Sequence, residues 1–297
     1  FIDFLIKLKK KIKKLNIYIC DNNINIFKKN IKKVTYIETC KVSENKNKYL
    51  KQIKNIVTKF KIELIVPCTN FDLDLLSKKK DYFKKKKCLL SVSDNNLIKK
   101  LINKNETYFF CKKNKISTPK IYQKFEEVIN KKKKFVIKEK FGHSSKGLKV
   151  ISNIKRKHFR KNYIVQDFIN GQEFHLDILN DFTGKFISCC PKKKIAMRDG
   201  ETEKAEIVLN KQIINYAKKI SKVFKHIGNL DCDLIIKKNK KIYFLDFNPR
   251  FGGGYPFTHL SGLNYLYMLI KKFPKNLKIN KPKLSKYTKG ISINTLM

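Results

Sequence analysis

The segment Leu245-Asp-Phe-Asn-Pro-Arg-Phe-Gly-Gly-Gly254 decides how the rest of this sequence is interpreted. Side chains alternate along a strand, so Asp246 and Asn248 are expected on one face of a strand that the following proline ends. Both offer the oxygen atoms that Mg²⁺ prefers as ligands. Arg250 follows at once and can approach a phosphate group, and the three glycines allow the backbone to come close to a ligand. A plain strand end with a polar turn would not explain this combination.

A second pair of carboxylates stands just upstream. Asp231 and Asp233 alternate along a strand predicted over residues 230–236. If that strand pairs with the one over residues 241–247 as a hairpin, a second carboxylate joins Asp246. The sequence therefore predicts oxygen ligands and an arginine gathered at the end of a β-hairpin.

Two earlier segments have the composition of nucleotide-binding loops. A predicted strand presents Lys138, and the small-residue loop Gly142–Gly147 follows it. Its backbone N–H groups and serine hydroxyls can bind phosphate oxygens, although such loops are as often plain hairpins. It is not the P-loop motif, because no Gly-Lys-Ser/Thr opens a helix. Next, in Val165–Glu173, the backbone of residues 166–168 can bind adenine, and Glu173 can bind the ribose hydroxyls.

The predicted elements follow two patterns along the chain. In the first third, strands and helices alternate, which indicates an open, mostly parallel α/β sheet; the strands are expected at 15–20, 34–38, 63–66 and 88–92, and the helices at 48–59 and 71–76. The turn at residues 67–72 then lies at the carboxyl end of a strand, where such sheets bind ligands. Helical signals cover residues 94–114. Farther on, the pattern favours antiparallel strands at 135–138, 148–151, 164–168 and 174–179, a basic loop at 191–201 that could clamp a γ-phosphate, and helices at 211–225 and 262–271.

Taken in this order, the segments resemble the ATP-grasp superfamily, and within it the proteins related to the large subunit of carbamoyl phosphate synthase. The resemblance covers roughly residues 15–295 and rests on Asn248–Gly254, on Pro191–Glu201, and on Ser117-Thr118-Pro119 after a helix that opens with Asn103-Lys104-x-x-Thr107. It implies an N-terminal open parallel α/β (pre-ATP-grasp) domain, residues 1–94, followed by an α+β ATP-grasp fold of two subdomains, residues 95–297. The small antiparallel subdomain is expected at about residues 115–170.

The resemblance also implies roles for individual residues. Lys104 and Lys138 would hold the α- and β-phosphates, the glycine loop would close over them, and Glu173 would take the ribose. With the adenine edge, the expected ATP-binding set is Lys104, Lys138, Gly142, Ser144, Ser145, Lys146, Gly147, Gln166, Asp167, Phe168 and Glu173. The implied Mg²⁺ ligands (with Mn²⁺ as an alternative metal) are Asp233, Asp246 and Asn248, and the residues implied to stabilise the transferring phosphoryl group are Lys194, Arg198 and Arg250. Positioning and charge neutralisation are what phosphoryl transfer mainly needs.

Several positions depart from the family pattern. Asn103 stands where the family usually has Asp, Asp246 where it usually has Glu, and Asp233 where it often has Gln. Because both aspartates still offer oxygen, altered metal geometry is expected rather than loss of the metal. The family's first strand and glycine-rich turn are expected to be missing before Phe1.

The basic composition is only weak evidence for a nucleic-acid-binding function. The formal net charge is +45, yet only four of the 69 basic residues are Arg, and the lysines are spread along the chain. Lys, Ile and Asn share AT-rich codons, so a biased genome would produce this composition without selection for basic partners. No apolar run approaches the roughly 20 residues that a membrane helix needs. No dedicated nucleic-acid partner and no membrane are therefore expected.

The cysteines and histidines carry little further information. None of the eight cysteines forms a Cys-x-x-Cys pair, so buried free thiols in a reducing cytoplasm are expected. His143 lies in the glycine loop and is within reach of a phosphate, whereas the other four histidines show no ligand spacing and are expected to be structural or exposed.

The function that these patterns predict is an ADP-forming ligase. It would phosphorylate a small carboxylate with ATP and transfer the acyl group to an amine or a similar nucleophile, in the cytoplasm. Two alternatives stay open: an ATP-binding regulatory or degenerate relative without ligase activity, motivated by the substituted metal positions, and a polyanion-binding protein, motivated by the charge alone. A homodimer is common among relatives, but no residue here indicates one.

Overall fold

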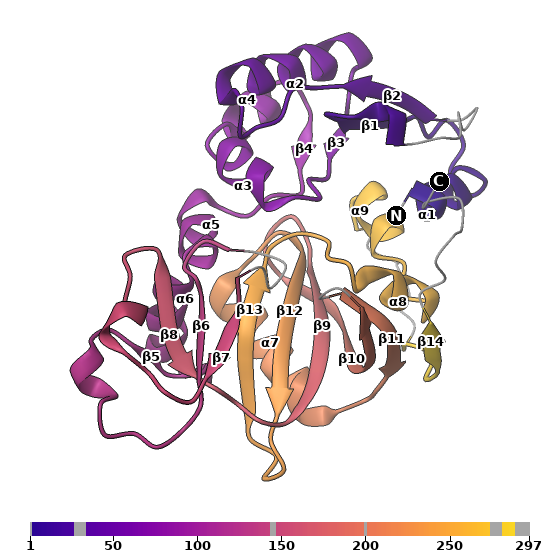
Figure 1. Cartoon of the computed structure of the whole chain (residues 1–297). Coiled ribbons are helices and arrows are strands. Elements are labelled where there is room, and N and C mark those ends of the chain that lie inside the picture. Colours follow the sequence, from indigo (N-terminus) through magenta and orange to yellow (C-terminus); the bar gives the residue numbers. More distant parts are fainter. Residues whose placement is uncertain (1, 27–33, 143–146, 199–200, 274–280, 289–297) are drawn as a thin grey trace.

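The computed structural model describes residues 2–26, 34–142, 147–198, 201–273 and 281–288 of the 297-residue chain. An N-terminal α/β part lies above a large sheet and a small sheet, which stand side by side (Figure 1). This arrangement is the expected mixture of α/β and α+β structure. None of the helices in the described ranges combines the length and the apolar character that a membrane crossing requires.

The N-terminal part contains the predicted alternation of strands and helices. Its elements are α1 (Ile2–Lys9), β1 (Ile17–Asp21), a 3₁₀ turn (Ile24–Ile26), β2 (Val34–Glu38), α2 (Lys46–Phe60), β3 (Leu64–Ile65), α3 (Asn70–Ser77), α4 (Lys80–Lys85) and β4 (Leu89–Leu90). The parallel pairing is confirmed, but β1 pairs only with β2 and β3 only with β4, so the described residues form two parallel pairs rather than one continuous sheet.

Helix α2 shows why these elements form where they do. The side chain of Asn45 accepts a hydrogen bond from the backbone N–H of Lys48 and so caps the helix. Its buried residues recur at helical spacing and join the apolar core of the N-terminal part; they are Tyr49, Leu50, Ile53 and Val57.

Two short helices lead into the small sheet. The helical signals over residues 94–114 resolve into α5 (Asn95–Ile102) and α6 (Lys104–Lys113), because Asn103 caps the second helix with its side chain. The small sheet has the order β5-β8-β6-β7, all antiparallel; its strands are β5 (Ile121–Tyr122), β6 (Phe135–Glu139), β7 (Lys149–Ile151) and β8 (Tyr163–Asp167).

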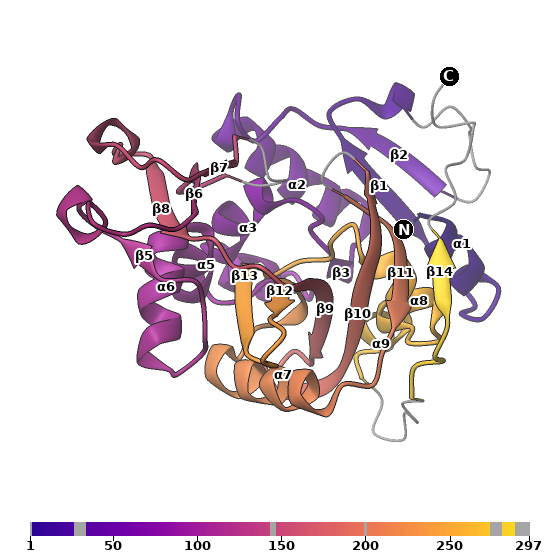
Figure 2. The same ribbon diagram turned by 60° about the horizontal axis from the view of Figure 1, so that its bottom comes forward.

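The large sheet forms the body of the molecule. Its order is β13-β12-β9-β10-β11-β14, and its strands are β9 (Gln172–Asn180), β10 (Phe186–Arg198), β11 (Glu201–Ile207), β12 (Gly228–Ile236), β13 (Ile242–Asn248) and β14 (Lys286–Thr288). Helix α7 (Lys211–Phe224) covers one face, as Figure 2 shows, and buries Ile213, Ala217, Ile220 and Phe224 against it. The predicted hairpin is confirmed: β12 and β13 are antiparallel neighbours, and Asp233 lies opposite Asp246.

The prediction of a basic loop at residues 191–201 is wrong. Residues up to Arg198 belong to β10, which pairs with β11; residues 199 and 200 lie outside the described residues. The run of lysines suggested a solvated loop. Along a strand, however, alternate lysines share one face, and there Lys192 is buried and Lys194 half-buried, each beside a carboxylate.

The C-terminal helices close the molecule. The helix expected at residues 262–271 is shorter, α9 (Tyr265–Ile270), and α8 (Tyr255–Leu260) precedes it without having been predicted. Helix α1 packs on both, since Leu8 lies in one apolar cluster with Tyr255 and Tyr265. The ring of Phe4 stacks on His259, with their centres 3.8 Å apart.

Candidate active site

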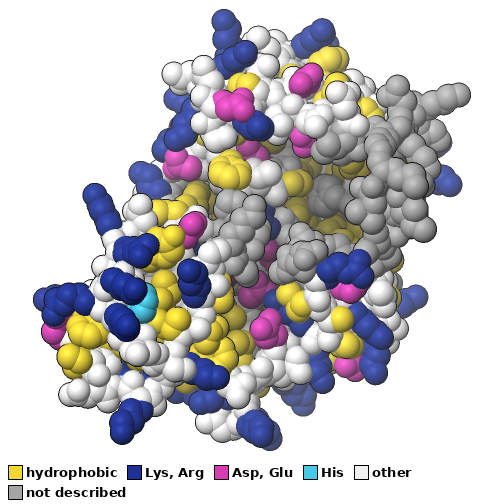
Figure 3. Space-filling model, in the orientation of Figure 1, with side chains coloured by type: hydrophobic (Ala, Val, Ile, Leu, Met, Phe, Trp, Pro, Cys, Tyr) yellow, Lys and Arg dark blue, Asp and Glu magenta, His cyan; other side chains and the backbone are white. Residues whose placement is uncertain are grey.

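Two adjoining cavities lie where the small sheet, the large sheet and the N-terminal part meet. The first, about 20 Å³, lies between Lys138 and Gln166 of the small sheet and Phe244–Phe247 of β13. The second, about 230 Å³, lies beside it, between Asn70 and Phe71 of α3 and the end of β13. Lys104 and Asp246 line both cavities. Figure 3 shows acidic side chains in the hollow of this face, with Lys and Arg spread over the surface around it.

Two lysines deliver positive charge to these cavities. Lys104 stands at the first turn of α6, and its Nζ donates to the carbonyl oxygen of Gly142 at 2.7 Å and lies 3.4 Å from Oδ1 of Asp246. Lys138 on β6 donates to the carbonyl oxygen of Leu245 at 3.2 Å, which bridges the two sheets. Burial lowers the pKa of Lys138 to about 8, helped by the nearby charge of Lys104 and opposed by Asp246.

Asp246 and Asn248 offer the oxygen donors that the sequence predicted. The Asp246 side chain is 25 % exposed, and its salt bridge to Lys104 is long. Its Oδ1 also accepts from the N–H of Phe247 at 3.1 Å. Oδ1 of Asn248 accepts from Nδ2 of Asn70 at 3.0 Å and keeps a second lone pair. This donor set suits a hard cation such as Mg²⁺.

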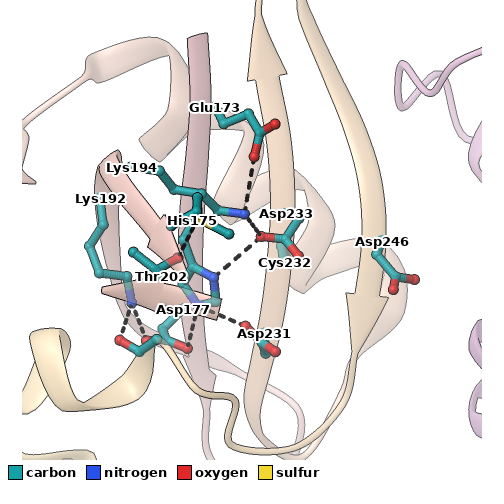
Figure 4. Close-up of polar contacts among 12 residues, drawn as sticks. Glu173, His175, Asp177, Lys192, Lys194, Thr202, Asp231, Cys232, Asp233 and Asp246 are labelled. Carbon is teal, nitrogen blue, oxygen red and sulfur yellow. Dashed lines mark hydrogen bonds and ion pairs between the residues drawn. The ribbon is translucent and has the colours of Figure 1, made fainter. Parts of the chain in front are cut away.

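The third predicted metal ligand has cationic neighbours of its own. Oδ1 of Asp233 lies 2.8 Å from Nζ of Lys194 and 3.4 Å from Nδ1 of His175 (Figure 4). Burial would raise the pKa of Asp233, but contact with His175 and Lys194 outweighs it, so the pKa lies well below its usual range. Asp233 therefore carries a full charge for a metal, provided that one of these contacts yields.

A line of alternating charges runs from Glu173 to Arg250 across β9, β10 and β12. Nζ of Lys194 joins Glu173 at 3.4 Å to Asp233. Nε2 of His175 lies 2.7 Å from Oδ1 of Asp231, whose other oxygen lies 3.2 Å from a guanidinium nitrogen of Arg250. In Figure 4, Asp246 lies apart from this line.

Neighbouring carboxylates, which outweigh burial, determine how this line is charged. Burial opposes a charge on His175, yet Asp231 and Asp177 outweigh it and hold the pKa of the imidazole well above its usual value. For Lys194, burial is likewise outweighed by Asp233 and Glu173, so its pKa is raised. The line is therefore a chain of ion pairs at neutral pH.

A second buried pair branches from it. Nζ of Lys192, which is fully buried, contacts Oδ2 of Asp177 and donates to Thr258 at 2.6 Å and to the carbonyl oxygen of Gly254 at 3.2 Å. Burial would raise the pKa of Asp177, but Lys192 and His175 lower it far below its usual range. His175, Asp177 and Asp231 stand close enough to hold a metal ion. Because Lys192 and Arg250 already neutralise these aspartates, we assign no metal to this group.

Two of the glycines after Arg250 pack closely on charged side chains of the protein. A Cβ on Gly252 would stand 2.1 Å from a carboxylate oxygen of Asp231, and a Cβ on Gly254 would stand 2.4 Å from Nε2 of His175. These glycines therefore let the loop lie against Asp231 and His175. Gly142, by contrast, lies over Glu139, whose Cβ would be 2.8 Å from an added Cβ.

The predicted adenine edge lies beside the first cavity, and part of it is already engaged. Gln166 is buried and lines the cavity. The N–H groups of Asp167 and Phe168 donate to the carbonyl oxygens of Lys120 and Lys134. The carboxylate of Asp167 pairs with Lys133 at 2.6 Å. The backbone N–H groups of residues 167 and 168 are therefore already used within the protein, whereas the Gln166 side chain faces the cavity.

Other predicted residues are not brought together here. Arg198 is 54 % exposed at the end of β10, where it pairs with Glu203 at 2.5 Å, and no interaction recorded among the described residues joins it to Asp246 or Lys138. Gly147, the last residue of the glycine loop, has a positive φ of 71°. His143, Ser144, Ser145 and Lys146 lie outside the described residues.

The structure also brings in residues that the sequence interpretation missed. His175 was expected to be structural or exposed, Lys192 belonged to a supposed loop, and Asp177 and Asn70 were not assigned. The signal was present for two of them: His175 and Asp177 alternate with apolar residues along one strand, as Asp231 and Asp233 do. What was lacking was the register that sets Asp177 opposite Asp231.

Known proteins share the fold of this chain. The model of the ATP-grasp domain family matches residues 101–254. A search of the curated proteins found no match. Among solved structures, an L-amino acid ligase from Bacillus licheniformis is similar with 16 % identity and a TM-score of 0.70, over 93 % of this chain and 72 % of that one.

Two further solved structures show the same architecture with bound nucleotides. An N5-carboxyaminoimidazole ribonucleotide synthetase in complex with ADP is 14 % identical, with a TM-score of 0.72 over 95 % of this chain and 76 % of that one. A biotin carboxylase–β-γ-ATP complex from Campylobacter jejuni is 13 % identical, with a TM-score of 0.71 over 95 % of this chain and 71 % of that one. At these identities, the likeness concerns the fold.

Proposed function

Because this chain belongs to the ATP-grasp family, whose model matches more than half of it, we propose that it is an ATP- and Mg²⁺-dependent ligase. In this proposal it phosphorylates a small carboxylate to an acyl phosphate, and an amine or a similar nucleophile then displaces inorganic phosphate. The observation that carries the proposal is the meeting of Lys104, Lys138 and Asp246 at the cavities between the two sheets.

The nucleotide would span both cavities. Lys104 and Lys138 would bind the α- and β-phosphates, since both ammonium groups are within reach of the same space. Glu173 would take the ribose, and the edge at residues 166–168 would take adenine. Anionic phosphates also explain why two lysines are held near each other, since without an anion they repel.

The metal would be held by Asp246 and Asn248, with Asp233 as a third oxygen donor. When bound, Mg²⁺ would neutralise charge on the phosphate oxygens. The protein's own cations would do the rest: Lys194 and Arg250 are in place beside Asp233 and Asp231, and each would exchange part of its carboxylate contact for a phosphoryl oxygen. Arg198 would join them only by leaving Glu203.

We infer the classes of substrate from the chemistry of the proposed reaction, not from particular residues of the cavities. An acyl phosphate needs a carboxylate, and an amine is the acceptor that the similarity to an L-amino acid ligase favours. We also propose the division of the chain into residues 1–94 and 95–297, with a small subdomain at about 115–170. A cytoplasmic location and a homodimer stay predictions, the second open to analytical ultracentrifugation.

The test is titration calorimetry of ATP with and without Mg²⁺, on the parent and on the double variant Asp246→Ala/Asn248→Ala. We expect Mg²⁺-dependent binding in the parent, weakened about tenfold or more in the variant, because two oxygen donors are lost. Asp81→Ala, on an exposed face of α4, is the control and should bind like the parent.

A substrate screen that reads out ADP and phosphate release then tests turnover. Release that depends on both a carboxylate and an amine supports the ligase. Tight Mg²⁺-dependent binding without turnover across a broad panel would favour an ATP-binding relative without ligase activity. A folded parent that binds no nucleotide would refute both.

A further inference from the structure

A single side chain of the N-terminal part reaches the residues that carry the proposed chemistry. Asn70 is the first residue of α3 and follows the turn at residues 67–69, at the carboxyl end of β3. Its Nδ2 donates to Oδ1 of Asn248 at 3.0 Å, and its Oδ1 accepts from Nε of Arg250 at 3.0 Å. One amide thus holds two functional side chains that are separated from it by most of the chain.

The orientation of this amide is determined by its partners. A guanidinium can only donate hydrogen bonds, so the oxygen of Asn70 must face Arg250 and its nitrogen must face Asn248. The nitrogen then occupies one lone pair of the Asn248 oxygen and leaves the other for a cation. Asn70 therefore selects which atom of Asn248 a metal would meet.

Arg250 is fixed from three sides by the same network. Nε binds Asn70, while one terminal nitrogen lies 3.2 Å from Asp231 and donates to the carbonyl oxygen of Phe251 at 3.0 Å. With Asn70 removed, the guanidinium would keep only its contacts to Asp231 and Phe251. Both contacts are made by the same terminal nitrogen. The guanidinium would therefore rotate about that nitrogen more freely than it does when Asn70 also holds Nε.

The N-terminal part also docks elsewhere, which separates docking from positioning. The hydroxyl of Ser93 accepts from the N–H of Ile227 at 3.0 Å, and Gly228 lies so close to Ser91 that an added Cβ would stand 2.2 Å from its hydroxyl. These contacts lie at the start of β12 and do not depend on Asn70. Asn70 instead lines the 230 Å³ cavity together with Asp246 and Asn248.

We propose that Asn70 is a positioning residue, through which the N-terminal part sets the orientation of the metal donor Asn248 and the phosphate-facing Arg250. This inference rests on the proposed function. It gives the N-terminal part a role in phosphoryl transfer. The family model does not cover Asn70, because its match begins at residue 101.

The experiment measures how nucleotide binding and turnover depend on Mg²⁺ concentration in Asn70→Ala. Ala has a high helix propensity, so α3 should persist, and Asn70→Ser is a second variant that keeps a polar group. We expect each variant to raise the Mg²⁺ concentration for half-maximal ATP binding about tenfold, as loss of an outer contact to a metal ligand does. The control Asn45→Ala removes the cap of α2 in the same part of the chain.

A double variant separates positioning from general damage. In Asn248→Ala, the additional change Asn70→Ala should produce little further loss of Mg²⁺ dependence, because both act on one ligand. Full additivity, or Mg²⁺ curves that match those of Asn45→Ala, would overturn the inference while leaving the proposed function intact. A parent without Mg²⁺-dependent ATP binding would overturn the proposed function and this inference together.

Discussion

Lys138 carries a charge at a place where the protein alone does little to stabilise it. Its pKa is lowered by burial to about 8, below the ordinary 10.5, so between these values the folded chain binds fewer protons than the unfolded chain. Stability therefore rises with pH across this window. Below pH 8, the folded protein bears the unfavourable charge, and only an anionic ligand relieves it.

Replacing Lys138 with Met should separate stability from binding. At pH 7, we expect the free energy of unfolding to rise by on the order of 1 kcal/mol, since a buried charge is removed, and Mg²⁺-dependent ATP binding to be lost. Denaturant unfolding and calorimetry measure the two effects. Lys149→Met, exposed on β7 of the same sheet, is the control. An unchanged ATP affinity in Lys138→Met would remove this residue from the site.

The parent should also lose ATP affinity as pH rises through 8. The free Lys138 ammonium deprotonates there, and a neutral amine attracts phosphate less. Bound phosphate raises the pKa of this lysine. Lys138 should therefore deprotonate at a higher pH in the ATP complex than in the free protein. Binding curves from pH 7 to 10 on parent and Lys138→Met check this, and a pH dependence that survives in Lys138→Met would assign it to another group.

Gly254 should tolerate no side chain. It has an ordinary helical φ of −83°, so the reason is steric alone: its Cβ would stand 2.4 Å from Nε2 of His175. We expect Gly254→Ala to destabilise the fold by about 1 to 3 kcal/mol, measured by thermal unfolding. His175→Ala in the same chain should recover part of that loss by opening space. No recovery would locate the damage elsewhere.

For single residues, the sequence predicted correctly which side chains lie together when they belong to one strand. Asp246, Asn248 and Arg250 follow one another closely in sequence, so alternation alone places them at one end of β13. His175 could not be placed in this way. Its contact with Asp231 depends on the pairing of β9 with β12, and a shift of that register by one residue would turn it to the other face.

Strand β10 shows that a lysine-rich segment can be a strand whose inward-facing lysines pair with carboxylates. The run Lys192–Lys194 suggested solvent, and helix and strand propensities offer nothing against that. The neighbouring strands override it, because β9 presents Asp177 and Glu173, and β12 presents Asp233, to the inward-facing lysines. Most helices, though not α4 or α8, and most strands were foreseen within a few residues, since apolar spacing decides them. The charged faces were not foreseen.

The buried pair in β9 and β10 should be strongly coupled. Lys192→Met leaves Asp177 charged in the core, and Asp177→Asn leaves Lys192 in the same condition, so each should cost about 3 to 5 kcal/mol. The double variant should be more stable than the sum of the two losses implies, by about 1 to 3 kcal/mol. Urea unfolding of all four proteins measures this. Additive losses would show that the two charges do not stabilise each other.

On the scale of the whole molecule, the first cavity lies between residues of the small sheet and of β13, which belongs to the large sheet. A nucleotide bound there would contact both sheets and tie them together in the folded state. We expect saturating MgATP at 100 times its Kd to stabilise the fold by about 2.7 kcal/mol, seen as a higher midpoint of thermal unfolding. MgATP without effect on the midpoint would contradict binding at this place.

The charge of +45 makes one further prediction for the whole surface. Binding to nucleic acid should be weak, indifferent to sequence and lost steeply with salt, because it comes only from released counterions. Titrations between 50 and 200 mM salt, with and without MgATP, measure this. Tight binding that persists at high salt would instead indicate a nucleic-acid partner.

The packing of α1 on α8 and α9 has a consequence for how the chain is made. Helix α1 is synthesised long before its partners Tyr255 and Tyr265, which lie near the other end of the described residues. Until those partners are made, Phe4 and Leu8 lack the aromatic residues that cover them in the folded protein. Closing such a long loop is slow, and exposed apolar residues aggregate meanwhile. Nascent chains of this protein should therefore depend on chaperones until the last helix is complete.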